Sequence, residues 1–317
     1  MTLTHKDAFG LLEKSDNILV LTHRNPDGDA VGSAFALWSV LHEMGKRVRV
    51  ELDTVSSSLS MVVNEEAFGD FEPDFVVTVD VADKKLLPEE QLGKYGDRVQ
   101  LAIDHHAANK PFSGALLLDA GAAAACEVIY DMLEAVNFPV SAATAAALYL
   151  GISTDTGCFR YPNCTAHTLY AASRLVECGA PNGEINRIVF ETKTRAYVQL
   201  ETLAMNSMKT YFDGRCALIV ITQDMFRKTG TTEADVHGIA ALPRQIEGVL
   251  AGIVIREKKD GGYKASVRTN EPLSASEICE AFGGGGHRLA AGCDLTGTQQ
   301  QAVNAILGAV SEALKEI

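Results

Sequence analysis

The chain has 317 residues, and its 28 basic and 41 acidic side chains give a formal net charge of −13. This length suits two domains, each of which can bury enough apolar surface to fold without disulfide staples. A protein that tracks long nucleic acid would normally carry an excess of basic residues. Any polyanionic substrate must therefore be small, or be held by local positive charge and metal ions.

The seven cysteines favour reduced thiols in a cytoplasmic protein. They are scattered, odd in number and nowhere arranged as a CxxC pair, which argues against a disulfide framework and against a zinc site. Residues 1–17 carry charges throughout and lack the apolar region of a signal peptide. No uninterrupted apolar run reaches membrane-spanning length, so we expect no membrane partner.

The first half of the chain alternates short β-branched runs with longer helical patterns. Brief runs rich in Val, Ile and Leu, bounded by charged or turn residues, predict strands at 17–23, 47–52, 74–80 and 98–104. Helical length and apolar spacing predict helices at 30–45, 125–136 and 141–152. This alternation predicts an α/β domain with a mostly parallel sheet and helices on both faces.

The second half begins with a long helical pattern and then returns to strands. From Pro181 to Phe212 polar and apolar residues follow the helical period with no strand between them, which predicts helices that link two domains. Strands follow at 216–222, 249–257 and 263–270, with helices at 274–282 and from 298 onward. We therefore expect a catalytic domain at 1–185, a helical linker at 186–212 and a smaller α/β domain at 213–317.

Acids and histidines follow three of the predicted strands and one predicted helix. They are His23, Asp27 and Asp29, then Asp80, then Asp104, His105 and His106, and finally Asp155. Ligands of open parallel sheets bind beyond the carboxyl ends of the strands. Singly, each residue could serve a turn or a helix cap, as in the NPDG turn. Jointly, so many acids would repel one another and cost stability, and a divalent cation removes that cost.

The ligand types indicate the kind of metal. A set of carboxylates and imidazoles without thiolate suits Mn²⁺, Mg²⁺ or Fe²⁺ better than structural zinc, and the imidazoles favour Mn²⁺. The number of acids exceeds the need of one ion. We therefore expect two ions roughly 3.5–4 Å apart that share one carboxylate, the arrangement used for in-line phosphoryl displacement.

Four segments resemble the motifs of a known superfamily. HRNPDGDAVGS, VTVDVAD, IDHH and GISTDTG, in this order, are similar to the four motifs of the DHH phosphoesterases. The segments KASVR and GGGGH resemble the DHHA1 domain that accompanies them. The resemblance covers nearly the whole chain, and the compact two-domain layout is similar to the bacterial oligoribonuclease (nanoRNase) and pAp-phosphatase group.

The resemblance implies specific roles at the metal site. One metal would be held by His23 and Asp27, the other by Asp29, His105 and Asp155, with Asp80 bridging the two. Asp104 would orient the His105 ring. His106 would donate to a phosphoryl oxygen or to the leaving group. The two metals are expected to be Mn²⁺, and a hydroxide bridging them would attack phosphorus in line.

The resemblance also implies a substrate site on the second domain, across an interdomain cleft that holds the active site. Backbone N–H groups of Gly284, Gly285 and Gly286, with His287 and Arg268, would bind the substrate, although a plain flexible loop is the alternative for this run. Further contacts are expected from Arg160 and Asn163. We expect structural roles for the histidines outside the motifs, which are His5, His42, His167 and His237.

The implied activity is an exonuclease-type hydrolysis of very short RNA to mononucleotides, with conversion of pAp to AMP as a further reaction. A cyclic-dinucleotide or linear pApA/pGpG phosphodiesterase would use the same residues and stays an alternative. The net charge argues against a processive RecJ-like exonuclease, and GGGGH argues against a family II pyrophosphatase. A non-catalytic nucleotide sensor would be favoured by a lost ligand, and none is lost here. The sequence leaves the oligomeric state open and allows a homodimer.

Overall fold

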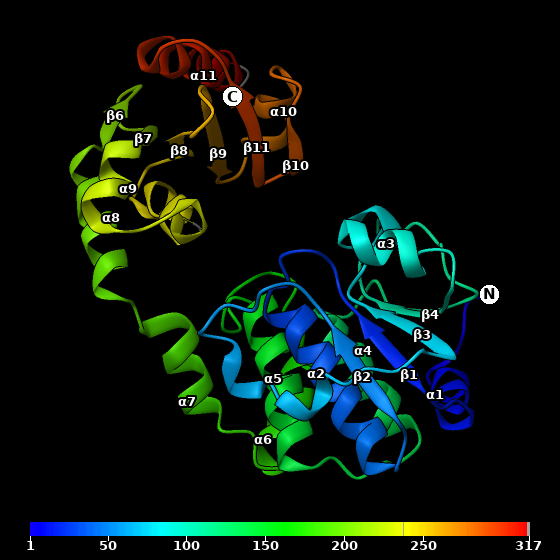
Figure 1. Cartoon of the computed structure of the whole chain (residues 1–317). Coiled ribbons are helices and arrows are strands. Elements are labelled where there is room, and N and C mark those ends of the chain that lie inside the picture. The colour runs from blue at the N-terminus through cyan, green and yellow to red at the C-terminus, as the bar shows by residue number, and fades with distance from the viewer. Residues whose placement is uncertain (237, 316–317) are drawn as a thin grey trace. The chain divides into compact units, whose positions relative to one another are not determined.

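The computed structural model describes residues 1–236 and 238–315. They form two compact units, which divide between Thr192 and Lys193 (Figure 1). This division falls within the segment 186–212, for which we expected a helical linker. None of the helices that the described ranges contain is long and apolar enough to cross a bilayer.

The first unit is built on a parallel sheet of five strands in the order β2-β1-β3-β4-β5. The strands are β1 (Ile18–Leu21), β2 (Val48–Glu51), β3 (Phe75–Val79), β4 (Val99–Asp104) and β5 (Ala115–Leu118). The first four confirm the predicted strands. The sequence did not predict β5, because a four-residue apolar run shows no period that separates a strand from a buried helix.

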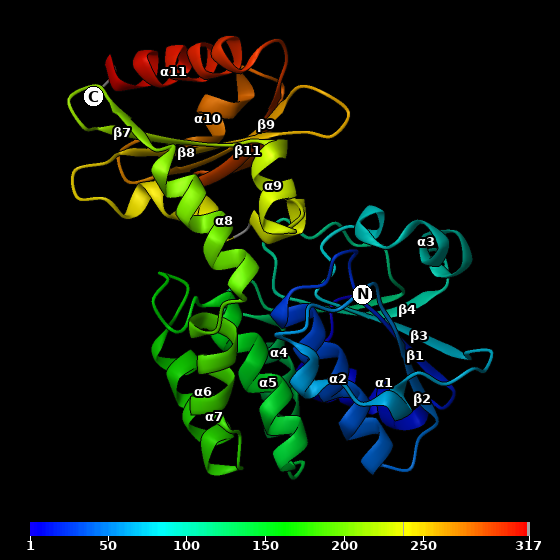
Figure 2. The same cartoon turned by 60° about the vertical axis from the view of Figure 1, so that its left-hand side comes forward.

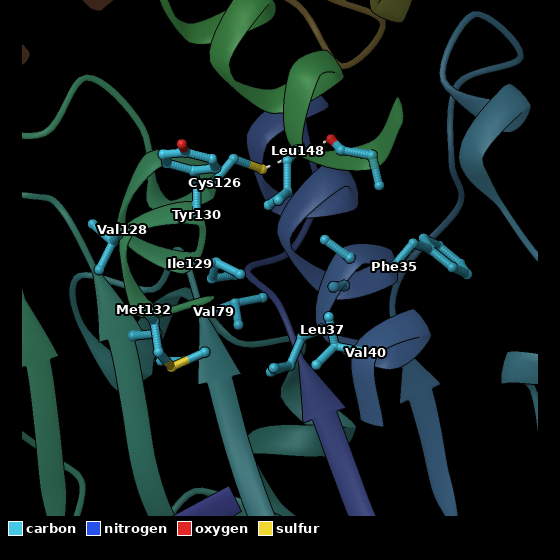
Figure 3. Packing of buried hydrophobic residues seen from close by; sticks show 14 of the residues in the cluster. Phe35, Leu37, Val40, Val79, Cys126, Val128, Ile129, Tyr130, Met132 and Leu148 are labelled. Carbon is cyan, nitrogen blue, oxygen red and sulfur yellow. Dashed lines mark hydrogen bonds between the residues drawn. The ribbon is translucent and has the colours of Figure 1, made fainter. Parts of the chain in front are cut away.

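Helices cover both faces of this sheet, as predicted (Figure 2). One face packs against α1 (His5–Lys14), α2 (Gly28–Glu43) and α4 (Ala125–Ala135), with α5 (Ala142–Asp155) and α6 (Ala166–Glu177) outside them. The other face packs against a short stretch that holds α3 (Glu89–Tyr95). In the larger core, Leu37 of α2, Val79 of β3 and Ile129 of α4 belong to one hydrophobic cluster (Figure 3).

Helices α2 and α5 approach closely because glycines form their contact. A Cβ atom on Gly32 would lie 2.5 Å from the Ala147 carbonyl oxygen, and one on Gly151 would lie 2.7 Å from Asp29 Oδ1 and nearer still to Cys126 Sγ. Real Cβ atoms do not approach other atoms so closely. The glycines therefore allow the first turn of α2 and the last turn of α5 to lie side by side.

We expect Gly151→Ala to destabilise the protein and Gly10→Ala to leave it as stable or more stable. The added methyl at position 151 must displace Cys126 or Asp29, at a cost of about 1–3 kcal/mol. Gly10 lies inside α1 with nothing within 4 Å of a Cβ, so alanine there should gain up to about 1 kcal/mol in helix propensity. Denaturant unfolding of both variants measures the difference. Equal stability of the two would contradict the packing described here.

The second unit contains a mixed sheet of six strands in the order β10-β11-β9-β8-β7-β6. Its strands are β6 (Lys209–Tyr211), β7 (Cys216–Ile221), β8 (Ala251–Glu257), β9 (Tyr263–Thr269), β10 (Gly285–His287) and β11 (Ala290–Leu295). One face packs against α10 (Ala275–Glu280) and α11 (Gln299–Lys315), and part of the other packs against α8 (Arg195–Asn206) and α9 (Gln223–Thr229). This confirms a second α/β domain.

One expectation for the linker segment and one alternative for the glycine-rich run are wrong. The helical pattern from Pro181 gives α7 (Asn182–Asn186), the π-helical turn Arg187–Glu191 and α8, but it ends at Asn206, and Lys209–Tyr211 instead pairs with β7. The glycine-rich run is also not merely a loop, because Gly285–His287 forms the edge strand β10 against β11. The small residues at the start of β11 lack the β-branched side chains that would have indicated a strand.

Candidate metal centre

The segment after β1 places a histidine and two aspartates around the start of α2. His23 follows the strand by two residues, and its Nδ1 donates to the Arg24 carbonyl oxygen at 2.9 Å. Asp27 is the N-cap of α2 and accepts from the backbone N–H groups of Asp29 and Ala30, each at 3.1 Å. The bond from His23 Nδ1 leaves the Nε2 atom of the neutral ring free to bind a metal.

Asp29 lies in the first turn of α2 and is fully enclosed, with 1% of its surface exposed. Its Oδ2 accepts from the backbone N–H of Ala125 at 2.6 Å, and its Oδ1 accepts from that of Cys126 at 2.9 Å. These N–H groups begin α4, so the Asp29 carboxylate satisfies two donors of a helix N-terminus, where the helix dipole favours negative charge. One aspartate thus joins α2 to α4 and faces the site.

Asp80 directly follows β3 and takes a left-handed backbone conformation, with φ of 58°. Such a φ is uncommon for residues other than glycine and costs about 1 kcal/mol or more, so the fold holds the residue there against a local preference. Its carboxylate is buried, with Oδ2 3.5 Å from His23 Nε2 and Oδ1 3.6 Å from His105 Nε2. Asp80 Oδ1 has no hydrogen-bond partner among the described residues.

Asp104, the last residue of β4, has other partners than we expected. Its Oδ1 lies 2.8 Å from His106 Nδ1 and also accepts from the backbone N–H of His105. Its Oδ2 accepts from Asn109 Nδ2 at 2.6 Å. Asp104 therefore orients the ring of His106, and the expectation that it orients the ring of His105 is wrong. The His105 ring is oriented by the Ala122 carbonyl oxygen, 3.3 Å from Nδ1.

The outward nitrogen of His105 meets carboxylates from three elements. His105 Nε2 lies 3.8 Å from Asp29 Oδ2, 3.6 Å from Asp80 Oδ1 and 3.6 Å from Asp155 Oδ2. Asp155 is the last residue of α5, and the glycine contact between α2 and α5 brings it to this place. Residues far apart in the sequence thus converge beyond the carboxyl ends of β1, β3 and β4.

The convergent side chains form three groups whose potential ligand atoms all lie within 4.8 Å of one another. They are His23 with Asp27 and Asp80, Asp29 with His105 and Asp155, and Asp80 with His105 and His106. Carboxylate and imidazole donors suit hard divalent cations, and the buried, unpartnered Asp80 Oδ1 is an atom that a cation would satisfy. The residues fit a pair of cations that share Asp80.

The electrostatics of the site favour retention of protons until a cation binds. Burial, with the neighbouring Asp29 charge, raises the pKa of Asp80 well above its usual value, and burial raises the pKa of Asp155 to about 7. Against the effect of burial, the Asp27 and Asp80 carboxylates raise the pKa of His23 to about 11. Since a ligand must give up its proton, metal binding and proton release are coupled.

We predict that loading the site with a divalent cation at neutral pH releases at least one proton per protein molecule. His23 alone would have to release one, because its pKa lies near 11 before the metal binds. Metal affinity should consequently fall as the pH is lowered. Calorimetric titrations in two buffers of different ionisation enthalpy count the protons. Equal heats in the two buffers, or an affinity independent of pH, would contradict the prediction.

The metal groups open into a pocket of about 250 Å³. Its lining includes three residues for which we had predicted no role, namely Arg24, Asn25 and Leu86. Arg24 and Asn25 lie inside the first motif, next to predicted ligands, and that position was the available signal. Leu86 ends a short 3-10 turn (Lys84–Leu86) after β3, and nothing in the sequence distinguishes it.

Asn163 and Arg160 were expected to contact substrate, and the structure gives both of them partners within the first unit. Asn163 Nδ2 donates to the carbonyl oxygens of Ala123 and Asp155, each at 3.1 Å. Arg160 Nε donates to the Gly157 carbonyl oxygen, and its guanidinium lies 6.0 Å from the centre of the Phe190 ring. Asn163 thereby ties the segment that carries Asp155 to the loop that orients His105.

On the second unit, the predicted substrate residues lie on or beside the edge strand β10 and on β9, two strands further in. Arg268 on β9 pairs with Ala290 on β11, which pairs with His287 on β10, so that both basic side chains lie in one row across the strands. Gly286 has φ of 149°, and a Cβ there would lie 2.5 Å from the Ala290 carbonyl oxygen. Gly284 and Gly285 line a separate pocket of about 430 Å³, together with Lys264 and Phe282.

The histidines outside the motifs have structural surroundings where the chain is described. His167 Nε2 lies 2.7 Å from Asp131 Oδ1, and the His42 ring stacks on Trp38 with 4.9 Å between the ring centres. His5 is partly buried at the start of α1. His237 lies outside the described residues.

Comparison with known proteins identifies both units. The family model described as "DHH family, N-terminal domain" matches residues 17–152, and the model described as "DHHA1 domain" matches residues 216–316. The chain is 30% identical over 304 residues to the bifunctional oligoribonuclease and PAP phosphatase NrnA of Thermus thermophilus. This match covers 94% of this chain and 90% of the relative. It is 28% identical over 287 residues to NrnA of Bacillus subtilis, with 88% and 90% covered.

A solved structure has the same fold. The crystal structure of an exopolyphosphatase-related protein from Bacteroides fragilis matches with a TM-score of 0.88 at 24% identity. The match covers 97% of this chain and 96% of that one. This likeness extends the shared architecture over both units.

Proposed function

Because the chain belongs to the DHH family, with a DHHA1 domain after its DHH domain, it is a metal-dependent phosphoesterase, and we propose that it hydrolyses very short RNA oligonucleotides to mononucleotides and pAp to AMP. The names of the relatives from Thermus thermophilus and Bacillus subtilis support both substrates, since each is an oligoribonuclease and PAP phosphatase. The net charge of −13 supports a short substrate over a long one.

The observation that carries this proposal is the pair of ligand groups that share Asp80. His23 and Asp27 would hold one cation, Asp29, His105 and Asp155 would hold the other, and Asp80 would contact both. When bound, two such cations activate water as the nucleophile and neutralise the charge that develops on the phosphoryl group. Mn²⁺ is the cation we propose, since imidazole and carboxylate ligands together suit it.

His106 would act on the substrate rather than on a metal. Its Nδ1 is engaged by Asp104 at 2.8 Å, so Nε2 is the nitrogen that remains for a phosphoryl oxygen or the leaving oxygen. In the metal-free site, the Asp104 hydrogen bond raises the pKa of His106 to about 9, so the ring there carries protons on both nitrogens at neutral pH. A proton held on Nε2 can stabilise an anionic oxygen, and Asp104 fixes the direction in which it points.

The second unit would bind the rest of the substrate. Arg268 and His287 lie in one row on β9 and β10, and an arginine guanidinium suits a phosphate. Gly284, Gly285 and Gly286 would let backbone groups approach an anion closely. We further propose a cytoplasmic location, which the seven free cysteines support.

Hydrolysis of a defined substrate panel tests the proposal. The panel contains 5′-phosphorylated di- to pentaribonucleotides, a long oligoribonucleotide, pAp, cyclic-di-AMP and pyrophosphate, each with Mn²⁺ or Mg²⁺. We expect mononucleotides from the shortest oligomers and AMP from pAp. Asp80→Asn should lower both rates by about a thousandfold or more, because one uncharged residue replaces the ligand shared by both cations.

The matched control is Asp97→Asn, which removes an equal charge from an aspartate that is 92% exposed and whose ion-pair partner among the described residues is Lys84. It should keep full activity. Hydrolysis of cyclic-di-AMP or pyrophosphate in place of the oligonucleotides would overturn the substrate assignment. Binding of nucleotides without any turnover would instead favour the sensor.

A further inference from the structure

Arg24 lies on the rim of the metal pocket, directly after His23. It lines the pocket together with Asp80, His106 and Asp155. Of the described residues that line this pocket, it is the one whose side chain carries a permanent positive charge. No hydrogen bond or ion pair within the described part of the chain engages its guanidinium, whereas that of Arg49, in the same unit, is paired with Glu51.

The backbone of Arg24 is held on both sides. Its N–H donates to the Leu86 carbonyl oxygen at 2.8 Å, and its own carbonyl oxygen accepts from His23 Nδ1 at 2.9 Å. The next residue, Asn25, is left-handed with φ of 54°, and its N–H donates to Asp53 Oδ2 at 3.3 Å. The guanidinium is thus carried by a fixed segment that also orients a predicted metal ligand, which suits a side chain that positions a substrate.

The net charge of the metal site with two divalent cations bound determines how much Arg24 contributes to phosphate binding. Asp27, Asp29, Asp80 and Asp155 together carry as much negative charge as two divalent cations carry positive charge. The centre with both cations is therefore close to neutral, and its attraction for a phosphoryl group depends strongly on the charges at its rim. Arg24 is the permanent cation placed there.

We propose that Arg24 binds the non-bridging oxygens of the scissile phosphoryl group and favours phosphomonoesters over phosphodiesters. The inference rests on the proposed function, because it concerns the same site. The 3′-phosphate of pAp carries close to two negative charges above its second pKa of about 6, whereas the linkage of a dinucleotide carries one. A monoester also offers one more anionic oxygen to a bidentate guanidinium. The residue would therefore set the balance between the two proposed reactions.

The test compares Arg24→Gln, Arg24→Lys and the control Arg174→Gln with the wild type. Arg174 is an exposed arginine on α6 whose partner is Glu177, it does not line the metal pocket, and its replacement changes the net charge equally. Two substrates that share a 5′-phosphorylated adenosine, pAp and pApA, are assayed at about pH 8, where the monoester is a dianion. Binding of inorganic phosphate and of diethyl phosphate to the Mg²⁺-loaded proteins is measured by calorimetry, independently of turnover.

We expect Arg24→Gln to lower kcat/KM for pAp by about ten- to hundredfold, and that for pApA by about threefold, in line with the loss of a charged hydrogen bond. Phosphate affinity should fall with the pAp activity, while the affinity for diethyl phosphate changes little. Arg24→Lys should restore part of the preference, because it keeps the charge without the planar pair of donors. Arg174→Gln should match the wild type in every assay.

An unchanged ratio of pAp to pApA hydrolysis in Arg24→Gln, or an unchanged phosphate affinity, would overturn the inference. If the wild type hydrolyses neither compound, the proposed function fails, and the phosphate affinities still decide the role of Arg24. In that case a phosphate affinity that is weaker in Arg24→Gln than in the wild type and in Arg174→Gln would support the binding role. Equal affinities of all four proteins would reject it.

Discussion

The repulsion among buried carboxylates is the constraint on which the first unit depends. Asp29 and Asp80 are enclosed, and Asp27 and Asp155 face the same small space. Without a cation, burial and mutual charge force some of these groups to keep protons, as the raised pKa values of Asp80 and Asp155 indicate. Proteins rarely enclose acids in this way unless a partner compensates for the cost. Two shared cations would compensate for it and would supply the chemistry of phosphoester hydrolysis at the same place.

The scaffold keeps these groups together by means that are otherwise unfavourable. The glycines at the contact of α2 and α5 lower the intrinsic stability of these helices, but they allow Asp155 to approach Asp29. Asp80 keeps a left-handed backbone at the end of β3. The Asp29 carboxylate satisfies the first N–H groups of α4, so a ligand also serves as a cap for a neighbouring helix. Stability and site geometry therefore depend on the same atoms in this region.

The sequence predicted the residues of the site better than their partners. The strands before His23, Asp80 and Asp104 are strongly apolar, so the position of each strand end could be inferred. Which ring Asp104 would orient could not be inferred, because His105 and His106 are adjacent and chemically identical, and only the folded structure places the His106 ring against Asp104. Strands β10 and β11 were missed because glycine and alanine carry little strand signal. The close approach of α2 to α5 depends on tertiary packing that periodicity does not describe.

The most direct test of the two-cation account is the anomalous diffraction of crystals grown with Mn²⁺. The account predicts two manganese peaks beyond the ends of β1, β3 and β4, roughly 3.5–4 Å apart, with the Asp80 carboxylate contacting both. His23 Nε2 should coordinate the ion at one peak, and His105 Nε2 should coordinate the ion at the other. A single peak, or two peaks that do not share Asp80, would contradict the account.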